Sequence, residues 1–396
     1  MSVLCIQTLL HTFRSIRYNK HMPTLLLILL TIALLGGNVL RWQFSGGYAV
    51  SLFDLIVTLS ALWILIIRWK TIIHHTLFKP TILFLGMLIV SLLFHVTRYS
   101  LSELMLAGSY TLRLSFLLLF IFLQRNKRQD VFLHVMGVGT IFLSLIQYFF
   151  YPSLRNLYYL GWDEHLYRAF GQFLDPNFLG IFLGMYLLFV VYQLLANKSS
   201  MFFLLTSLSL TITTLFLTYS RESYIVALLG LIAFAMMKKL LTFKFFGTSL
   251  IICLVLFTGY TLFAHKSEGT KLFRTASITQ RLASDQQSLL VFAQNPLIGV
   301  GFNAYAFARP HLPFAPQNTL YANHAAASPD STYLLILATT GVVGFGVFLY
   351  FLYCLVAYRR DAFGISVSIL FLTSGFFINS LFYPLLFVWY LLLIRE

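Results

Sequence analysis

The sequence has few charged residues, and acidic residues are the scarcest of them. Of 396 residues only 10% are charged, and Asp and Glu together number 12. An ordinary soluble domain carries about 25% charged residues, so this chain cannot cover a water-facing surface of normal size. The three cysteines, Cys5, Cys253 and Cys354, lie in or near predicted membrane or cytoplasmic segments. These shortages exclude a soluble enzyme and a disulfide-stapled secreted module.

Long hydrophobic runs are what the sequence has instead. Hydrophobic residues make up 59% of the chain, with 41 Phe and 22 Tyr. The runs are continuous and long enough for helices, whereas the strands of a membrane barrel alternate apolar and polar residues. We therefore predict an all-α polytopic membrane protein. A span needs roughly 20 apolar residues, and the predicted spans are 23–40, 48–67, 80–97, 105–124, 131–151, 177–196, 201–218, 223–238, 243–264, 331–357, 363–379 and 381–394.

The last two of these spans are short, and Pro384 interrupts the second of them. They could form a re-entrant hairpin, so the prediction is 10–12 transmembrane helices. Three parts follow along the chain: spans over 1–264, one long loop on the outer side over 265–330, and C-terminal spans over 331–396.

The basic residues predict an orientation. The formal net charge is +15, but Lys and Arg lie between the apolar runs and do not form a phosphate-binding face, so no nucleic-acid partner is expected. More of them fall on the side of the N-terminus, which predicts a cytoplasmic N-terminus. The first apolar run has no cleavage site after it and is interpreted as a retained span.

Within the long loop, one helix is predicted. Asn295-Pro296 ends it, and Gly299 and Gly301 mark a turn beyond. Arg281 falls beside the apolar arc that should face the protein. The residues that recur at helical spacing are Ile278, Leu282, Leu289, Phe292 and Ala293.

Two ionisable residues lie inside predicted spans, where charge is costly. Asp54 lies about two turns into the second span, and Arg113 lies at a similar depth in the fourth. They could form a buried ion pair that fixes packing, or Arg113 could line a cavity and face an anion.

Polar residues from separate segments map to the outer side of the membrane. Arginine with carboxylates suits an anionic lipid headgroup such as a pyrophosphate, because a guanidinium binds phosphate oxygens in pairs. Simpler interpretations are available: Asp175 and Asp330 could be helix N-caps, and residues 163–165 and 220–222 could be solvated turns. No metal-binding spacing of histidines occurs. The outer-side residues are Asn177, Arg221, Glu222, Arg281, His324 and Asp330.

Four stretches resemble the family of bacterial O-antigen ligases and repeat-unit polymerases, which are polytopic membrane glycosyltransferases. They occur in the family's order over roughly 160–350, around the same long outer loop. The stretches are Gly171-Gln-Phe-Leu-Asp-Pro-Asn177, Tyr219-Ser-Arg-Glu222, Arg281 with Asn295-Pro-Leu-Ile-Gly-Val-Gly301, and Asp330-Ser-Thr-Tyr-Leu334 with Thr340-Gly-Val-Val-Gly344.

The resemblance implies a GT-C-type fold and a reaction at the periplasmic face. An acceptor hydroxyl attacks a glycan carried on undecaprenyl pyrophosphate, and the lipid pyrophosphate leaves. The family's arginine positions correspond to Arg221 and Arg281, which would hold the pyrophosphate in place of a metal. No cofactor is expected, and a chain-length regulator is a possible partner.

At Asp330 the sequence departs from the ligases, which commonly have His there to engage the acceptor hydroxyl. We expect Asp330, Glu222 or His324 to take that role, with Asp330 held as a weakly basic anion by a helix N-terminus. The departure favours a polymerase, with ligation to lipid A–core as the alternative and a transporter as the second class. Tyr158, Tyr159 and Trp162 could stack on sugars or form an interfacial aromatic belt.

Overall fold

The computed structural model describes residues 22–44, 49–123, 125–160, 162–197, 199–240, 270–271, 276–309 and 328–395. The predicted span at 243–264 lies outside these ranges. The described part is helical apart from one short hairpin, which confirms the all-α prediction. Its elements are α2 (Met22–Gly36), β1 (Arg41–Gln43), β2 (Ala49–Ser51), α3 (Leu52–Ile73), α4 (Phe78–Phe94), α5 (Leu101–Leu119), η2 (Phe120–Phe122), α6 (Gln129–Phe150), η3 (Arg155–Leu160), η4 (Gly171–Phe173), α7 (Pro176–Leu195), α8 (Met201–Leu217), α9 (Arg221–Met237), α11 (Ala276–Gln294), α12 (Tyr305–Ala308), α14 (Thr332–Tyr358), α15 (Ala362–Ser374) and α16 (Pro384–Ile394).

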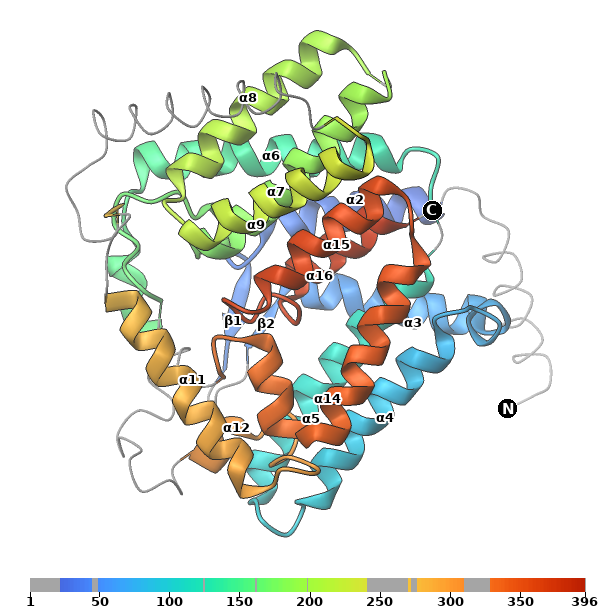
Figure 1. Cartoon of the computed structure of the whole chain (residues 1–396), viewed down its shortest axis with the longest axis vertical. Helices are drawn as coiled ribbons and strands as arrows, with labels where there is room; N and C mark the ends of the chain where they lie inside the picture. Colours follow the sequence, from blue (N-terminus) through green and yellow to red (C-terminus); the bar gives the residue numbers. More distant parts are fainter. Residues whose placement is uncertain are drawn as a thin grey trace, which may run out of the picture.

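The helices form two groups around α16. In Figure 1, α6, α7, α8 and α9 lie together in the upper part, and α4, α5 and α14 lie in the lower part. Helix α7 packs against α8, α9 and α15, while α14 packs against α4 and α11. Within the described ranges, five segments are long and apolar enough to span a membrane: α3, α5 with η2, α6, α7 and α14. Shorter apolar helices there are α2, α4, α8, α15 and α16.

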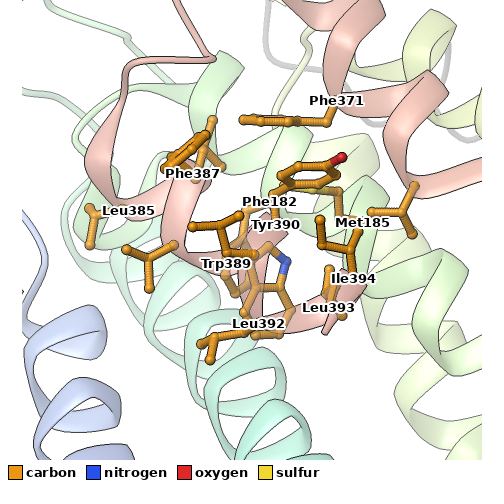
Figure 2. Packing of buried hydrophobic residues seen from close by; sticks show 14 of the residues in the cluster. Phe182, Met185, Phe371, Leu385, Phe387, Trp389, Tyr390, Leu392, Leu393 and Ile394 are labelled. Carbon is orange, nitrogen blue, oxygen red and sulfur yellow. The ribbon is translucent and has the colours of Figure 1, made fainter. Parts of the chain in front are cut away.

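Helix α16 is surrounded by protein. Pro384 does not interrupt this helix, as the sequence suggested, but begins it, where its missing N–H costs nothing. The helix has 11 residues, about 16 Å at 1.5 Å per residue, which is too short to cross a hydrocarbon core of about 30 Å alone. Every residue from Leu385 to Ile394 is buried. Figure 2 shows this packing, in which Trp389 stacks on Phe182 with ring centroids 4.4 Å apart.

Helix α14 was predicted as one span, but it is broken. Gly341 has φ 67° and ψ −171°, so the helix changes direction there. The loop that follows α11 bonds to the break: Val300 N donates to Ala338 O at 3.1 Å, and Val342 N donates to Pro296 O at 2.9 Å. A Cβ on Gly299 would lie 2.2 Å from the Thr339 carbonyl carbon. Two of the four stretches that carried the resemblance therefore interlock, and they fix the C-terminal end of α11 against α14.

A hairpin not predicted from the sequence connects α2 to α3. Strands β1 and β2 pair antiparallel with Arg41 opposite Ser51, so α3 starts at Leu52 and the expected span from 48 is four residues too long at its start. The turn between α2 and β1 is held to the rest of the protein, because Asn38 N donates to Gln172 O at 2.9 Å.

Candidate active site

An ion pair between α9 and α11 lies at the centre of the candidate site. Arg281 Nη2 lies 2.5 Å from Glu222 Oε2, and the Glu222 side chain is only 4% exposed while that of Arg281 is 34% exposed. Glu222 is held in the first turn of α9, which Ser220 caps by accepting from Ser223 N. Because a buried carboxylate without a cation is costly, Arg281 is the residue that stabilises Glu222 in this position.

The second oxygen of Glu222 remains available. Oε1 is buried and makes no hydrogen bond to any residue in the described ranges. A buried carboxylate oxygen of this kind carries a desolvation cost that a hydroxyl donor would relieve. Glu222 can therefore accept a hydrogen bond from a ligand while it keeps its ion pair to Arg281.

Helix α11 is present as predicted, but its apolar arc does not face the protein. Ile278, Leu282 and Leu289 are 48%, 57% and 50% exposed, whereas Ser288 and Val291 are buried. Val291 packs against residues that follow α11 and residues of α14, so periodicity alone does not identify the packed face. Arg281 lies beside this arc, on the side that meets α9.

Asp330 lies next to the same helix. Its backbone N donates to Ser284 Oγ at 3.4 Å, and Ser284 is about one turn along α11 from Arg281. Burial raises the pKa of the Asp330 carboxyl; Arg281 opposes this rise, while the negative charges of Asp285 and Asp175 add to it.

Both sequence-based expectations for Asp330 are therefore corrected. Ser331, not Asp330, caps α14, accepting from Leu334 N. The expected weakly basic anion is also wrong, because burial and neighbouring carboxylates outweigh the helix terminus. A carboxylate with a raised pKa is a better proton acceptor near neutral pH.

Asn177 is fixed by the two chain segments around it. Its Oδ1 accepts from Ser220 Oγ at 2.9 Å and from Arg168 Nη2 at 3.4 Å. Arg168 is buried and also donates through Nε to Thr218 O at 2.8 Å. The start of α7 and the start of α9 are thus held together beside Glu222 by one arginine and one amide.

Asp175 is the N-cap of α7, as the simpler interpretation proposed, and accepts from the backbone N of Asn177 at 2.6 Å. It also lies among charged groups. Burial raises the pKa of Asp175, while Arg168 is the strongest influence that lowers it. His165 Nε2 lies 3.8 Å from Asp175 Oδ2. The prediction that residues 163–165 form a solvated turn is wrong for His165, whose side chain is 10% exposed.

The remaining predicted residues fall in three places. Arg221 is the first residue of α9 and is half-buried next to Glu222. His324 lies outside the described residues, as do the side chains of Tyr158 and Tyr159. Trp162 is covered by the guanidinium of Arg41, 5.7 Å from its ring centroid.

Sequence reasoning missed Arg168 and His165, which face the site without belonging to a quoted motif. The available signal was their position a few residues before Asp175, in a loop longer than a turn. Among the described residues, no group of three or more His, Cys, Asp or Glu side chains is placed to hold a metal ion.

Asp54 and Arg113 form the ion pair predicted from the sequence, with Arg113 Nε 2.6 Å from Asp54 Oδ1. Their predicted depth is corrected for Asp54, which lies in the first turn of α3 and completes a capping box with Ser51. Ser51 N and Oγ both donate to Asp54 Oδ2, at 2.9 and 2.7 Å.

We expect Asp54→Asn to destabilise the protein, because it breaks a buried pair and half of the capping box. Breaking such a pair costs about 3–5 kcal/mol, so the yield of folded protein and its Tm in detergent should both fall. Ser100–Glu103 forms the same capping box on α5 at an exposed position. Glu103→Gln is therefore the matched control, and an equal loss of Tm in both variants would contradict the role of the pair.

Residues far apart in sequence thus converge: Asp175 and Asn177 before and in α7, Glu222 on α9, Arg281 on α11, and Asp330 before α14. The cluster combines arginines with carboxylates, one of which has an unused buried oxygen. Such a site can bind an anion and accept a proton from a hydroxyl.

A comparison with known families agrees with this chemistry. Residues 204–349 match the sequence model of a family described as O-antigen ligase. The matched part includes Glu222, Arg281 and Asp330, and it ends after the break in α14. No curated protein matches the chain. The match confirms the resemblance noted in the sequence: residues 204–349 are similar to the O-antigen ligase family, which points to a glycan-transferring membrane enzyme.

Proposed function

We propose that the protein is a polymerase that extends a glycan carried on undecaprenyl pyrophosphate by adding oligosaccharide repeat units. The observation that carries this proposal is the buried Glu222–Arg281 pair. It places a guanidinium, which pairs through Nη2, next to a carboxylate whose Oε1 has no partner among the described residues, and the reaction needs both a cation and an acceptor.

Arg281 and Arg221 are proposed to hold the pyrophosphate. A guanidinium has five N–H donors, and the ion pair to Glu222 is made through Nη2 of Arg281. Arg221 stands in the first turn of α9, where the helix dipole disfavours a cation. Its position there is unfavourable for the helix alone, and a bound phosphate would offset that cost.

Asp330 is proposed as the group that engages the acceptor hydroxyl, with Glu222 and His324 as the other candidates. The acceptor oxygen forms a bond to the anomeric carbon as its proton passes to the carboxylate. The bond from that carbon to the pyrophosphate oxygen breaks, and its electron pair leaves with the lipid pyrophosphate. The arginines stabilise the charge that develops on the leaving group.

The proposal places the reaction at the periplasmic face of the bacterial inner membrane, with a cytoplasmic N-terminus. In this arrangement α11 belongs to a periplasmic loop over 265–330, with membrane spans before it over 1–264 and after it over 331–396. A lipid-linked glycan is then both donor and acceptor, and Arg113 and Asn177 would line the cavity that receives them.

Reconstitution with lipid-linked repeat units tests this function. The purified protein in liposomes should convert the donor alone into a ladder of products, and Arg281→Ala should abolish the ladder. Arg155→Ala is the matched control, because the Arg155 side chain is exposed and pairs with Glu164 and not with Glu222. No product from folded protein, with or without an added acceptor, would contradict glycan transfer.

Ligation is the second candidate, because the matched family is described as O-antigen ligase. In that case the donor alone gives no ladder, and a single transfer appears when lipid A–core is added. Polymerisation comes first because the resemblance leads us to expect His in ligases at the position where this chain has Asp330.

We expect catalysis to continue without divalent metal. Two arginines supply the positive charge that a metal would otherwise supply to the pyrophosphate. Product formation should therefore change by less than about twofold in excess EDTA, and added Mg²⁺ or Mn²⁺ should have no effect. Activity that EDTA removes and a metal restores would show that the arginines are not sufficient.

A further inference from the structure

A second pair of arginines lies on the other side of the α7 start. Arg41 in β1 and Arg113 in α5 come from segments far apart in sequence. Burial lowers the pKa of the Arg41 guanidinium; Tyr110, Tyr383 and Asp54 raise it, and the positive charge of Arg113 lowers it further. Arg41 lies opposite Ser51 in the hairpin, and Ser51 donates to Asp54, the ion-pair partner of Arg113. These contacts make the two cations neighbours.

One carboxylate serves this pair, and its capacity is already used. Asp54 Oδ1 accepts from Arg113 Nε, and Oδ2 accepts from the backbone and side chain of Ser51. Arg41 makes no ion pair with any residue in the described ranges, and Arg113 makes only the one to Asp54. The half-buried cluster thus carries one positive charge more than it can neutralise, which is costly unless an anion binds.

Rigid contacts hold the pair in place. Leu52 N donates to Leu40 O at 2.9 Å, so the end of the hairpin is tied to the start of α3. Arg41 also lies over the Trp162 ring, which restricts the guanidinium. Arg113 is fixed through its Nε, and its side chain is 35% exposed, so its terminal nitrogens can reach a ligand.

The pair adjoins the site described above. Asn38 Nδ2 donates to the Tyr383 hydroxyl at 2.6 Å and to Phe173 O at 2.9 Å, just before Asp175. Tyr383 stacks on Phe178, with ring centroids 4.0 Å apart. Tyr383 interacts electrostatically with Arg41 and Arg113 on one side and with Asp175 on the other. One buried tyrosine thus connects the arginine pair with Asp175 of the candidate active site.

We propose that Arg41 and Arg113 form a second anion site, which binds the phosphoryl group of the second lipid-linked substrate. This inference rests on the proposed function, since transfer between two lipid-linked molecules requires two phosphate-bearing headgroups near one reaction centre. Two guanidinium forks around one headgroup fit the several oxygens of a phosphate or pyrophosphate. The headgroup belongs to undecaprenyl pyrophosphate if the acceptor is a growing chain, and to lipid A if it is lipid A–core.

Lipid stoichiometry measured on the full-length protein in detergent tests the site. Native mass spectrometry with undecaprenyl pyrophosphate should show two lipids per chain for the unaltered protein. Arg41→Gln and Arg281→Ala should each lose one lipid, and the double variant should lose both. The Kd of the lipid at the altered site should rise about ten- to a hundredfold, because charge-assisted hydrogen bonds are removed. Arg41→Lys should recover only part of the lost affinity.

Matched variants and lipids assign each outcome. Arg155→Gln removes one exposed arginine and should keep both lipids. A second lipid that appears with lipid A, and not with undecaprenyl pyrophosphate, supports the site and assigns it to lipid A phosphate. Equal binding by Arg41→Gln and Arg155→Gln would overturn the second site. If Arg281→Ala keeps both lipids while Arg41→Gln loses one, the second site stands and the pyrophosphate role of Arg281 fails.

Discussion

Arg281→Lys should be almost as inactive as Arg281→Ala, with kcat lowered on the order of 10²- to 10³-fold in both. A lysine keeps the charge but offers it as one point, so it cannot pair with Glu222 Oε2 and bind pyrophosphate oxygens together. Initial rates of product formation in liposomes, with the donor saturating, measure the effect. The Tm of each variant in detergent shows whether the protein remains folded.

Arg155→Lys provides the matched control for this substitution. Arg155 also pairs with a glutamate, with Nη2 3.1 Å from Glu164 Oε1, but it is 81% exposed. The same exchange there should leave kcat within about twofold, because exposed pairs contribute little. Full activity in Arg281→Lys would refute the clamp and leave Arg281 as a simple counter-charge to Glu222.

The second large effect is expected at Asp330. Asp330→Asn should lower kcat on the order of 10²- to 10⁴-fold, as loss of a general base does. Burial raises the pKa of this carboxyl, so the unaltered enzyme should lose activity as the pH falls through that raised pKa and the carboxylate becomes protonated. Asp330→His should retain activity, with its acid limb near the usual histidine pKa of about 6.5.

Asp285 offers a control of the same residue type on α11. Its negative charge helps to raise the pKa of Asp330, so Asp285→Asn should move the acid limb of the profile to lower pH while kcat at neutral pH changes by less than about tenfold. An unchanged acid limb in both Asp330→His and Asp285→Asn would show that Asp330 does not accept the proton. Glu222, with its unused Oε1, would then be the next residue to test.

Asp330 also shows why this site could not be predicted in full from the sequence. Its position before a helix predicts that Asp330 is the N-cap and that its carboxylate is stabilised as a weakly basic anion. The outcome depends on Ser284 and Asp285, which are brought to Asp330 by α11 from about 45 residues away. The pKa of Asp330 depends on burial by distant segments, and the local sequence around Asp330 does not show that burial.

The same limit applies to the packed faces of helices. The spacing of Ile278, Leu282 and Leu289 correctly predicts a helix, because helical periodicity is a property of the local chain. It does not tell which side meets protein, because the residues that bury Ser288 and Val291 come from other segments of the chain. Pro384 is a similar case: proline limits a helix in either direction, and only the packing of α16 shows that the helix begins there.

The sequence by itself determined the class of the protein, because scarce charge and long apolar runs leave only a helical membrane protein. Its ordered set of short stretches also predicted the likeness to the O-antigen ligase family that residues 204–349 show. The sequence also predicted the Asp54–Arg113 pair, since two opposite charges in apolar spans must compensate each other. The tertiary structure decided which polar groups meet: the Glu222–Arg281 pair, the contacts of Arg168 and His165, the broken α14 and the Arg41–Arg113 pair. These contacts join segments that are distant in the chain, and their energies depend on burial and charge at the meeting point, which exist only after the chain has folded.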